Sequence, residues 1–137
     1  MQNILLRSFL AVLGGLIIGS VVNMGTIMIG SGIITPPAGA DVTTTEGLKK
    51  SLHLFETKHF LFPFLAHAFG TFAGTYASTR IANKHHFNLA LVVTVFFLIG
   101  GIINIVALPS PLWFSITDLA LAYFPMGWLG WRAARRK

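Results

Sequence analysis

The sequence contains no cysteine, which excludes disulfide bonds, thiolate metal sites and thiol redox chemistry. Acidic residues are almost as scarce, since Asp and Glu together number four in 137 residues. Charged residues make up 10% of the chain, against about 25% in a soluble domain, which must cover its core with a hydrated surface. The chain therefore carries too few charges to solvate a globular surface, and we expect it to fold in a lipid bilayer.

Several functional signatures are also missing. The net charge is +6, but the basic residues stand at the ends of apolar stretches and do not form a stripe with interleaved aromatics, so nucleic-acid binding is not expected. Nucleophilic G-x-S-x-G, P-loop and dinucleotide-binding patterns are absent. The histidines lack the spacing of helical metal ligands. We therefore assign no catalytic residue, metal or cofactor from the sequence.

Long apolar stretches are what the sequence does have, with a mean hydropathy of +0.73. A helix needs about 20 apolar residues to cross the hydrocarbon core. Four stretches predict an all-α, four-transmembrane-helix bundle in a single membrane domain, residues 1–137. They are residues 4–34, 60–82, 87–108 and 119–131 with flanks. The first is longer than needed, so it tilts or stops spanning near Gly30, and the fourth is short and interrupted by Pro125.

The placement of charge predicts the topology. With four spans, Arg7, Arg80, Lys84 and the tail "RAARRK" fall on one side. Lysines in the loop after the first span fall on the other side, where they are diluted by acids. Because an excess of Lys and Arg marks the cytoplasmic side, we expect both termini to be cytoplasmic, in a bacterial inner membrane.

Two halves of the sequence resemble each other. "LIIGSVVNMG" and "FLIGGIINIV" align Asn23 with Asn104, and "ETKHFLFP" and "DLALAYFP" align Glu56 with Asp118 and Phe-Pro with Phe-Pro. Chance similarity between short apolar runs is the alternative. We favour two repeated helical hairpins, at about residues 4–82 and 87–137, related by an axis along the membrane normal.

The loop between the first two spans contains a predicted helix of its own. "TTTEGLKKSLHLFE" places Thr43 and Glu46 at capping-box spacing, followed by apolar residues at helical intervals. We expect a short amphipathic helix in this first outer loop. A connector that covers the end of the bundle is the favoured interpretation, and a lid or a partner-docking element is the alternative.

The stretch 60–82 carries two neighbouring stripes with a spacing of four residues. One is small and the other is polar, so this face meets protein or water and not lipid. The small stripe is Ala66, Gly70, Gly74 and Ser78, and we expect Gly15, Gly19, Gly100 and Gly101 to serve helix packing in the same way. The polar stripe contains His67, Thr71 and Thr75.

The ionisable and amide residues within the spans are the candidate functional residues. His67 either handles protons or forms a structural hydrogen bond, to Asn23 or Asn104 for example. The two asparagines either meet each other and fix helix register, or contact substrate. The candidate polar path is His67, Thr71, Thr75, Asn23, Asn104, Glu56, His59 and Asp118.

Proline and acid positions add an outer-surface hypothesis. Pro63 and Pro125 are expected to kink the outer ends of their helices, so that Glu56, His59 and Asp118 surround a polar vestibule. The acids alternatively act as helix caps.

Three functions stay open. The first is a homo-oligomeric transporter or channel for a small solute or ion. The second is a non-catalytic accessory or assembly subunit, whose partner is another membrane protein. The third, and least favoured, is a membrane enzyme acting on a lipid or quinone through Glu56, His59 and Asp118.

Overall fold

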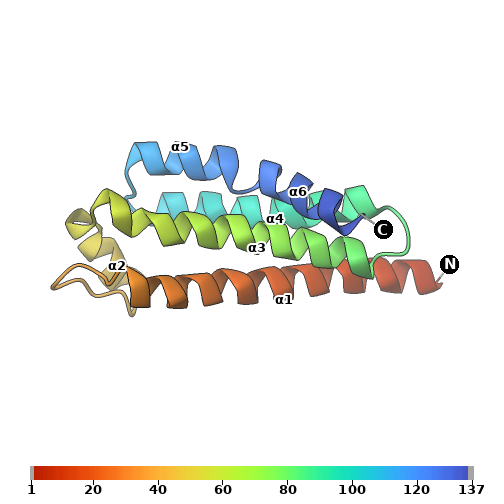
Figure 1. The fold of residues 1–137 in the computed structure, drawn as a ribbon, viewed down its shortest axis with the longest axis horizontal. Helices are drawn as coiled ribbons and strands as arrows, with labels where there is room; N and C mark the ends of the chain where they lie inside the picture. Colours follow the sequence, from red (N-terminus) through yellow and green to blue (C-terminus); the bar gives the residue numbers. More distant parts are fainter. Residues whose placement is uncertain (1, 136–137) are drawn as a thin grey trace.

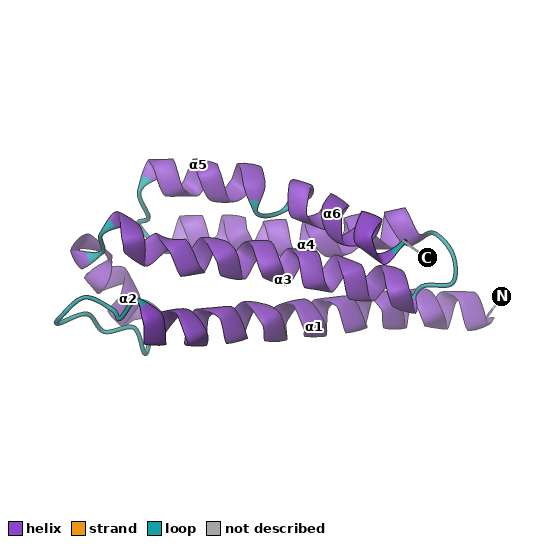
Figure 2. Ribbon diagram, viewed as in Figure 1, coloured by secondary structure: helices purple, strands orange, loops and turns teal. Residues whose placement is uncertain are grey.

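The computed structural model describes residues 2–135, and within that range every regular element is helical. The elements are α1 (Gln2–Ile33), α2 (Thr45–Ser51), the 3₁₀ turns η1 (Leu52–Leu54) and η2 (Thr57–Phe60), α3 (Leu61–Ile81), α4 (His86–Ala107), α5 (Leu112–Leu121) and α6 (Phe124–Ala134). The long helices lie side by side, and both termini lie at the same end (Figures 1 and 2). The loops gather at the two ends of the bundle, apart from the short connection between α5 and α6.

Two helices, α1 and α4, are long and apolar enough to cross a membrane. The 32 residues of α1 extend over about 48 Å at 1.5 Å per residue, and the helix continues through Gly30 to Ile33. Whether this stretch tilts or stops spanning near Gly30 stays a prediction. Large apolar side chains such as Leu5, Phe9 and Met28 are exposed along α1, as they are on a surface that faces lipid.

Helix α3 is the centre of the bundle and contacts α1, α4, α5 and α6. Its buried residues are all small or hydroxyl-bearing: Ala66, Ala68, Gly70, Thr71, Gly74, Thr75, Ala77, Ser78 and Thr79. Short side chains let the neighbouring backbones approach closely, which is how helices associate where lipid removes the hydrophobic drive.

The backbones of α1 and α3 approach each other closely. A methyl group placed on Gly74 would lie 2.8 Å from the carbonyl oxygen of Gly15, and one on Gly70 would lie 2.9 Å from the carbonyl oxygen of Gly19. Methyl groups on Gly15 and Gly19 would meet the carbonyls of Gly74 and Gly70 in turn. The four glycines therefore form a reciprocal contact inside one chain.

The fourth apolar stretch is not one helix. The helix is interrupted at Ala122 and Tyr123, between α5 and α6. The two short helices together run beside α3 and α4 (Figure 1). Pro125 lies in the first turn of α6, and Pro63 lies in the first turn of α3. Both prolines thus stand at helix starts, where backbone N–H groups have no helical acceptor and a proline costs no hydrogen bond. At Pro125 the structure has a complete interruption of the helix in the preceding turn in place of the expected kink.

The predicted loop helix forms, one residue later than the capping box suggested. Thr44, and not Thr43, caps α2, and its hydroxyl accepts a hydrogen bond of 2.9 Å from the N–H of Gly47. Beyond α2, Leu52 packs with Phe60 and Phe114 in a small apolar core. The segment 45–60, called the cover below, thus closes one end of the bundle.

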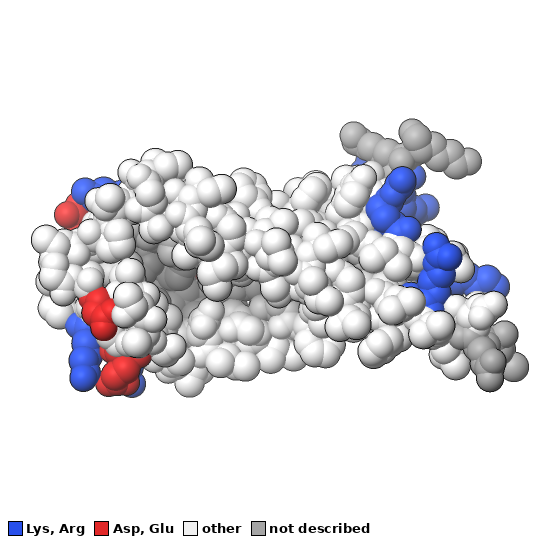
Figure 3. All heavy atoms as spheres, turned by 90° about the horizontal axis from the view of Figure 1, so that it is seen from below, with Lys and Arg blue, Asp and Glu red and all other residues white. Residues whose placement is uncertain are grey.

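Charged side chains gather at the two ends of the molecule, and a broad uncharged band separates them on the face seen in Figure 3. The end that holds the cover carries acidic and basic residues together. The end that holds the termini carries only basic residues among those described: Arg7, Arg80, Lys84, Arg132 and Arg135.

Candidate functional site: a His–Asp–Tyr cluster beside a cavity

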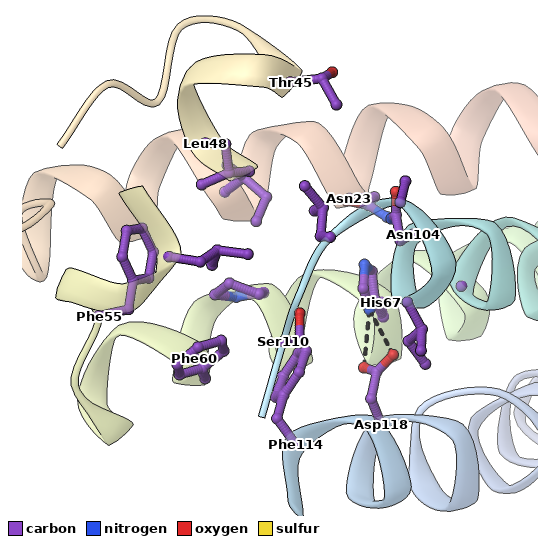
Figure 4. Close-up of a pocket in the computed structure, with 17 residues that line it drawn as sticks. Asn23, Thr45, Leu48, Phe55, Phe60, His67, Asn104, Ser110, Phe114 and Asp118 are labelled. Carbon is purple, nitrogen blue, oxygen red and sulfur yellow. Dashed lines mark hydrogen bonds and ion pairs between the residues drawn. The ribbon is translucent and has the colours of Figure 1, made fainter. Parts of the chain in front are cut away.

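His67 and Asp118 are hydrogen-bonded, although 51 residues separate them in the sequence. His67 lies two turns into α3, and Asp118 lies in α5. The Nδ1 atom of His67 is 2.8 Å from Oδ1 and 3.0 Å from Oδ2 of Asp118 (Figure 4). The exposed fraction is 1% for the Asp118 side chain and 16% for that of His67. The buried carboxylate is thus shielded from solvent by the imidazole ring.

Tyr123 completes the cluster. Its hydroxyl donates a hydrogen bond of 3.0 Å to Oδ2 of Asp118, and its ring stacks on that of His67 with centroids 5.9 Å apart. Gly101 of α4 provides the room, since a methyl group there would collide with the Tyr123 hydroxyl. The helix break at Ala122 and Tyr123 turns this tyrosine into the bundle.

The geometry fixes one tautomer of His67 when Asp118 is ionised. An ionised carboxylate only accepts hydrogen bonds, so Nδ1 of a neutral His67 then carries the hydrogen and donates it. Its Nε2 atom then carries a free lone pair and can accept a hydrogen bond. A second proton on Nε2 would make His67 a cation paired with Asp118. The pair can therefore take up and release one proton without breaking its own hydrogen bond.

The other edge of the His67 ring faces a cavity of about 330 Å³. Figure 4 shows Asn23 and Asn104 on the side of the ring opposite Asp118. Side chains from α1, α3, α4, α5 and the cover line the cavity, and Figure 3 shows the surface hollowed near the same end. The polar lining residues are Asn23, Thr45, His67, Asn104, Ser110 and Asp118.

The two asparagines line this same cavity, from α1 and α4. Within residues 2–135, the structure records no hydrogen bond from either side-chain amide, to the other amide or to His67. The expected pairing of the asparagines is therefore not what the structure shows. Asn23 is half-buried and Asn104 is exposed, so both amides can hydrogen-bond to whatever enters the cavity.

Thr71 and Thr75 lie in the core and away from the cavity lining. The Thr71 hydroxyl donates to the carbonyl of His67 at 2.8 Å, and the Thr75 hydroxyl donates to that of Thr71 at 2.9 Å. Both hydroxyls are thus satisfied by their own helix, as threonines in apolar surroundings often are. The polar path predicted along α3 stops at His67.

Glu56 and His59 are separate from Asp118. They line another recess, with Lys58 and the prolines of the 34–38 loop. The N–H of Glu56 donates to Nδ1 of His59 at 2.9 Å, and its carboxylate is 3.3 Å from the ammonium of Lys58. Glu56 begins the η2 turn, whereas Asp118 is buried near the end of α5. A vestibule formed by all three residues is therefore not present.

The residues predicted for helix packing have different surroundings. Gly15, Gly19, Gly70 and Gly74 form the contact between α1 and α3, Ala66 and Ser78 are buried in α3, and Gly101 receives Tyr123. Gly100 is exposed, and a methyl group on it would have no neighbour within 4 Å.

Sequence analysis did not single out Tyr123, which stands among aromatic residues near the ends of the apolar stretches, as do Trp113 and Trp128. Trp113 and Trp128 are about half exposed, but Tyr123 is 1% exposed. A buried tyrosine hydroxyl needs a partner, and Asp118 five residues earlier was the available signal.

Comparison of the chain with protein-family models, with characterised proteins and with solved structures found no match.

Proposed function

We propose that the chain is a four-span membrane protein that carries a small solute through the cavity beside His67, and that His67 exchanges a proton during transport. The observation that carries the proposal is the 2.8 Å bond between His67 and the buried Asp118, with the other ring edge toward the cavity. Ionisable residues within a span are costly and are characteristic of proton and substrate pathways.

The arrangement of the bundle supports four spans. In the proposal α1, α3 and α4 each cross the bilayer, and α5 with α6 forms a fourth, broken crossing. Broken helices are tolerated at membrane depth where the freed backbone lies against protein or a cavity. The exclusively basic end, which also carries both termini, is placed in the cytoplasm, and the cover faces outward.

We propose the internal repeat in a weaker form, in which the two hairpins remain equivalent at the asparagines but not at the acids. Asn23 and Asn104 both line the cavity, as equivalent positions of two hairpins would. Glu56 and Asp118 do not share an environment, so the second half has diverged around its helix break.

The two alternative functions are less well supported. An accessory subunit would present its small-residue stripe to a partner, but Gly70 and Gly74 already contact α1. A membrane enzyme acting through Glu56, His59 and Asp118 would need the three side chains together, and they line two different recesses.

The cavity is lined by elements of one chain, so in the proposal a second copy is not needed to complete it. Homo-oligomerisation stays a prediction. The mass of the protein in a nanodisc, measured by native mass spectrometry, tests it independently of transport.

The test of the proposed function is proton movement driven by solutes. The purified chain is reconstituted in liposomes containing a pH-sensitive dye, and a panel of small solutes is added outside. We expect at least one solute to change the internal pH, and His67→Gln to abolish that change. His85→Gln, at the basic end, is the matched control and should leave it intact. Solute flux that persists in His67→Gln would overturn the role of His67.

A further inference from the structure

The charge of the residues that line the cavity indicates which ligands it can bind. Of the residues that line it, Asp118 and His67 are the two that titrate, and no lysine or arginine is among them. Tyr123 touches the pair from the α5–α6 break, while α1, α4 and the cover contribute only the neutral groups of Asn23, Asn104 and Thr45. With Asp118 ionised and His67 neutral, the cavity carries one negative charge.

The remaining lining favours an organic cation. Phe55, Phe60 and Phe114 lie at the cavity wall, with ring centroids 5.9 Å apart for Phe55 and Phe60 and 4.9 Å for Phe60 and Phe114. Aromatic rings attract cations and pack against apolar bodies. The Oδ1 atoms of Asn23 and Asn104 and the Nε2 atom of His67 are acceptors for N–H groups.

The volume of the cavity limits the size of its ligand. About 330 Å³ is at the lower end of ligand cavities, which suits a molecule with one small ring or a short chain and excludes a whole lipid. An anion finds no positive side chain there while His67 is neutral.

We propose that the transported solute is a small organic ammonium ion, exchanged for a proton on His67. This inference rests on the proposed function and names its substrate class. When the ammonium ion occupies the cavity, its charge is balanced by the Asp118 carboxylate, and His67 is neutral. When it leaves, water on that side supplies a proton to Nε2 of His67. The site again holds one positive charge against Asp118, so one cation is exchanged for one proton.

Three ligands of similar shape but different charge test which ligand charge the cavity prefers. They are benzylammonium, benzyl alcohol and benzoate. Each is titrated by calorimetry into the full chain in nanodiscs of uncharged lipid. We expect benzylammonium to bind, benzyl alcohol to bind at least about tenfold more weakly, and benzoate to bind least.

Asp118→Asn should remove the preference, so that benzylammonium and benzyl alcohol bind equally. Glu56→Gln is the matched control, because it removes an exposed acid that lies outside the cavity, and the preference should persist. If Asp118→Asn does not fold, the three-ligand comparison on the unaltered chain decides. Equal binding of ammonium and alcohol, tighter binding of benzoate, or loss of the preference in Glu56→Gln overturns the inference.

The two proposals fail differently. A neutral or anionic solute that drives proton movement dependent on His67 supports the proposed function and overturns the substrate class. Binding of benzylammonium that depends on Asp118, without proton movement by any solute, supports a cation site and overturns transport.

Discussion

The hydroxyl of Tyr123 lies against Gly101, in the space that any side chain at position 101 would fill. This contact between α4 and the α5–α6 break holds the tyrosine where it donates to Asp118. The cluster at the cavity therefore depends on a residue that bears no side chain.

Gly101→Ala should consequently destabilise the protein. The added methyl group pushes the Tyr123 hydroxyl off Asp118, and overpacking of this kind costs about 1–3 kcal/mol. Gly100→Ala is the matched control, because nothing lies within 4 Å of its new methyl group and alanine favours helix. Thermal unfolding in detergent measures both. Equal melting temperatures would show that Tyr123 has another position available at no cost.

The glycine contact between α1 and α3 predicts a defect in folding, and not in association with a partner. Gly74→Leu inserts a branched side chain where the carbonyl of Gly15 and the ring of Phe97 already lie, so the two helices must separate. We expect the variant to be recovered in low yield and to aggregate in size-exclusion chromatography.

Gly25→Leu is the control for that experiment, since the space beside Gly25 is open. It should give the yield and elution volume of the unaltered chain. A Gly74→Leu protein that folds normally but loses a bound membrane protein would instead support the accessory-subunit hypothesis.

The loop before α2 should loosen in acid. The side chain and backbone N–H of Thr43 both donate to the Asp41 carboxylate, and these hydrogen bonds hold the pKa of Asp41 below its ordinary value of 3.8. Because the folded pKa is depressed, the stabilisation is present above pH 3.8 and is lost as the pH falls through the folded pKa.

Amide hydrogen exchange of the 40–47 segment, followed against pH and corrected for intrinsic rates, measures this loosening. Asp41→Asn should exchange faster at neutral pH and should show no further change in acid. Protection that is unchanged down to pH 2 in the unaltered chain would contradict the assignment.

The sequence predicted an all-helical chain because long apolar runs and helical spacing are local signals. It also identified α1, α4 and the cover helix, and it singled out His67 and Asp118 as polar residues that needed an explanation. It did not pair them. The contact joins α3 to α5 across 51 residues, and nothing in the local pattern of either stretch specifies it.

At Pro125, a proline inside an apolar run, the sequence predicted a kink, whereas the structure has a break in the helix. The break falls two residues earlier, and it turns Tyr123 inward because the hydroxyl finds Asp118 and Gly101 leaves room. Tertiary contacts of this kind decide between a kink and a break. The similarity between Glu56 and Asp118 likewise could not reveal that one carboxylate is exposed and the other buried.

Absence of cysteine makes the proposed topology directly measurable, because each introduced cysteine is the only thiol in the chain. We expect accessibility to a membrane-impermeant maleimide to alternate along the sequence. Cysteines at Lys50 and Pro109 should react in intact cells, whereas those at Asn3, Lys84 and Arg135 should react only after permeabilisation. All five positions are exposed in the structure, so burial does not hide them.

The pattern of maleimide labelling tests each proposed membrane crossing separately. The Asn3 and Lys50 variants bracket α1, Lys50 and Lys84 bracket α3, Lys84 and Pro109 bracket α4, and Pro109 and Arg135 bracket α5 with α6. The last pair matters most, since neither α5 nor α6 alone is long enough to cross about 30 Å of hydrocarbon. Reaction of Arg135→Cys from outside would leave three spans and remove the broken helix from the membrane. A complete inversion of the pattern would keep four spans but place the cavity at the cytoplasmic face, so that the solute would enter it from the cell interior.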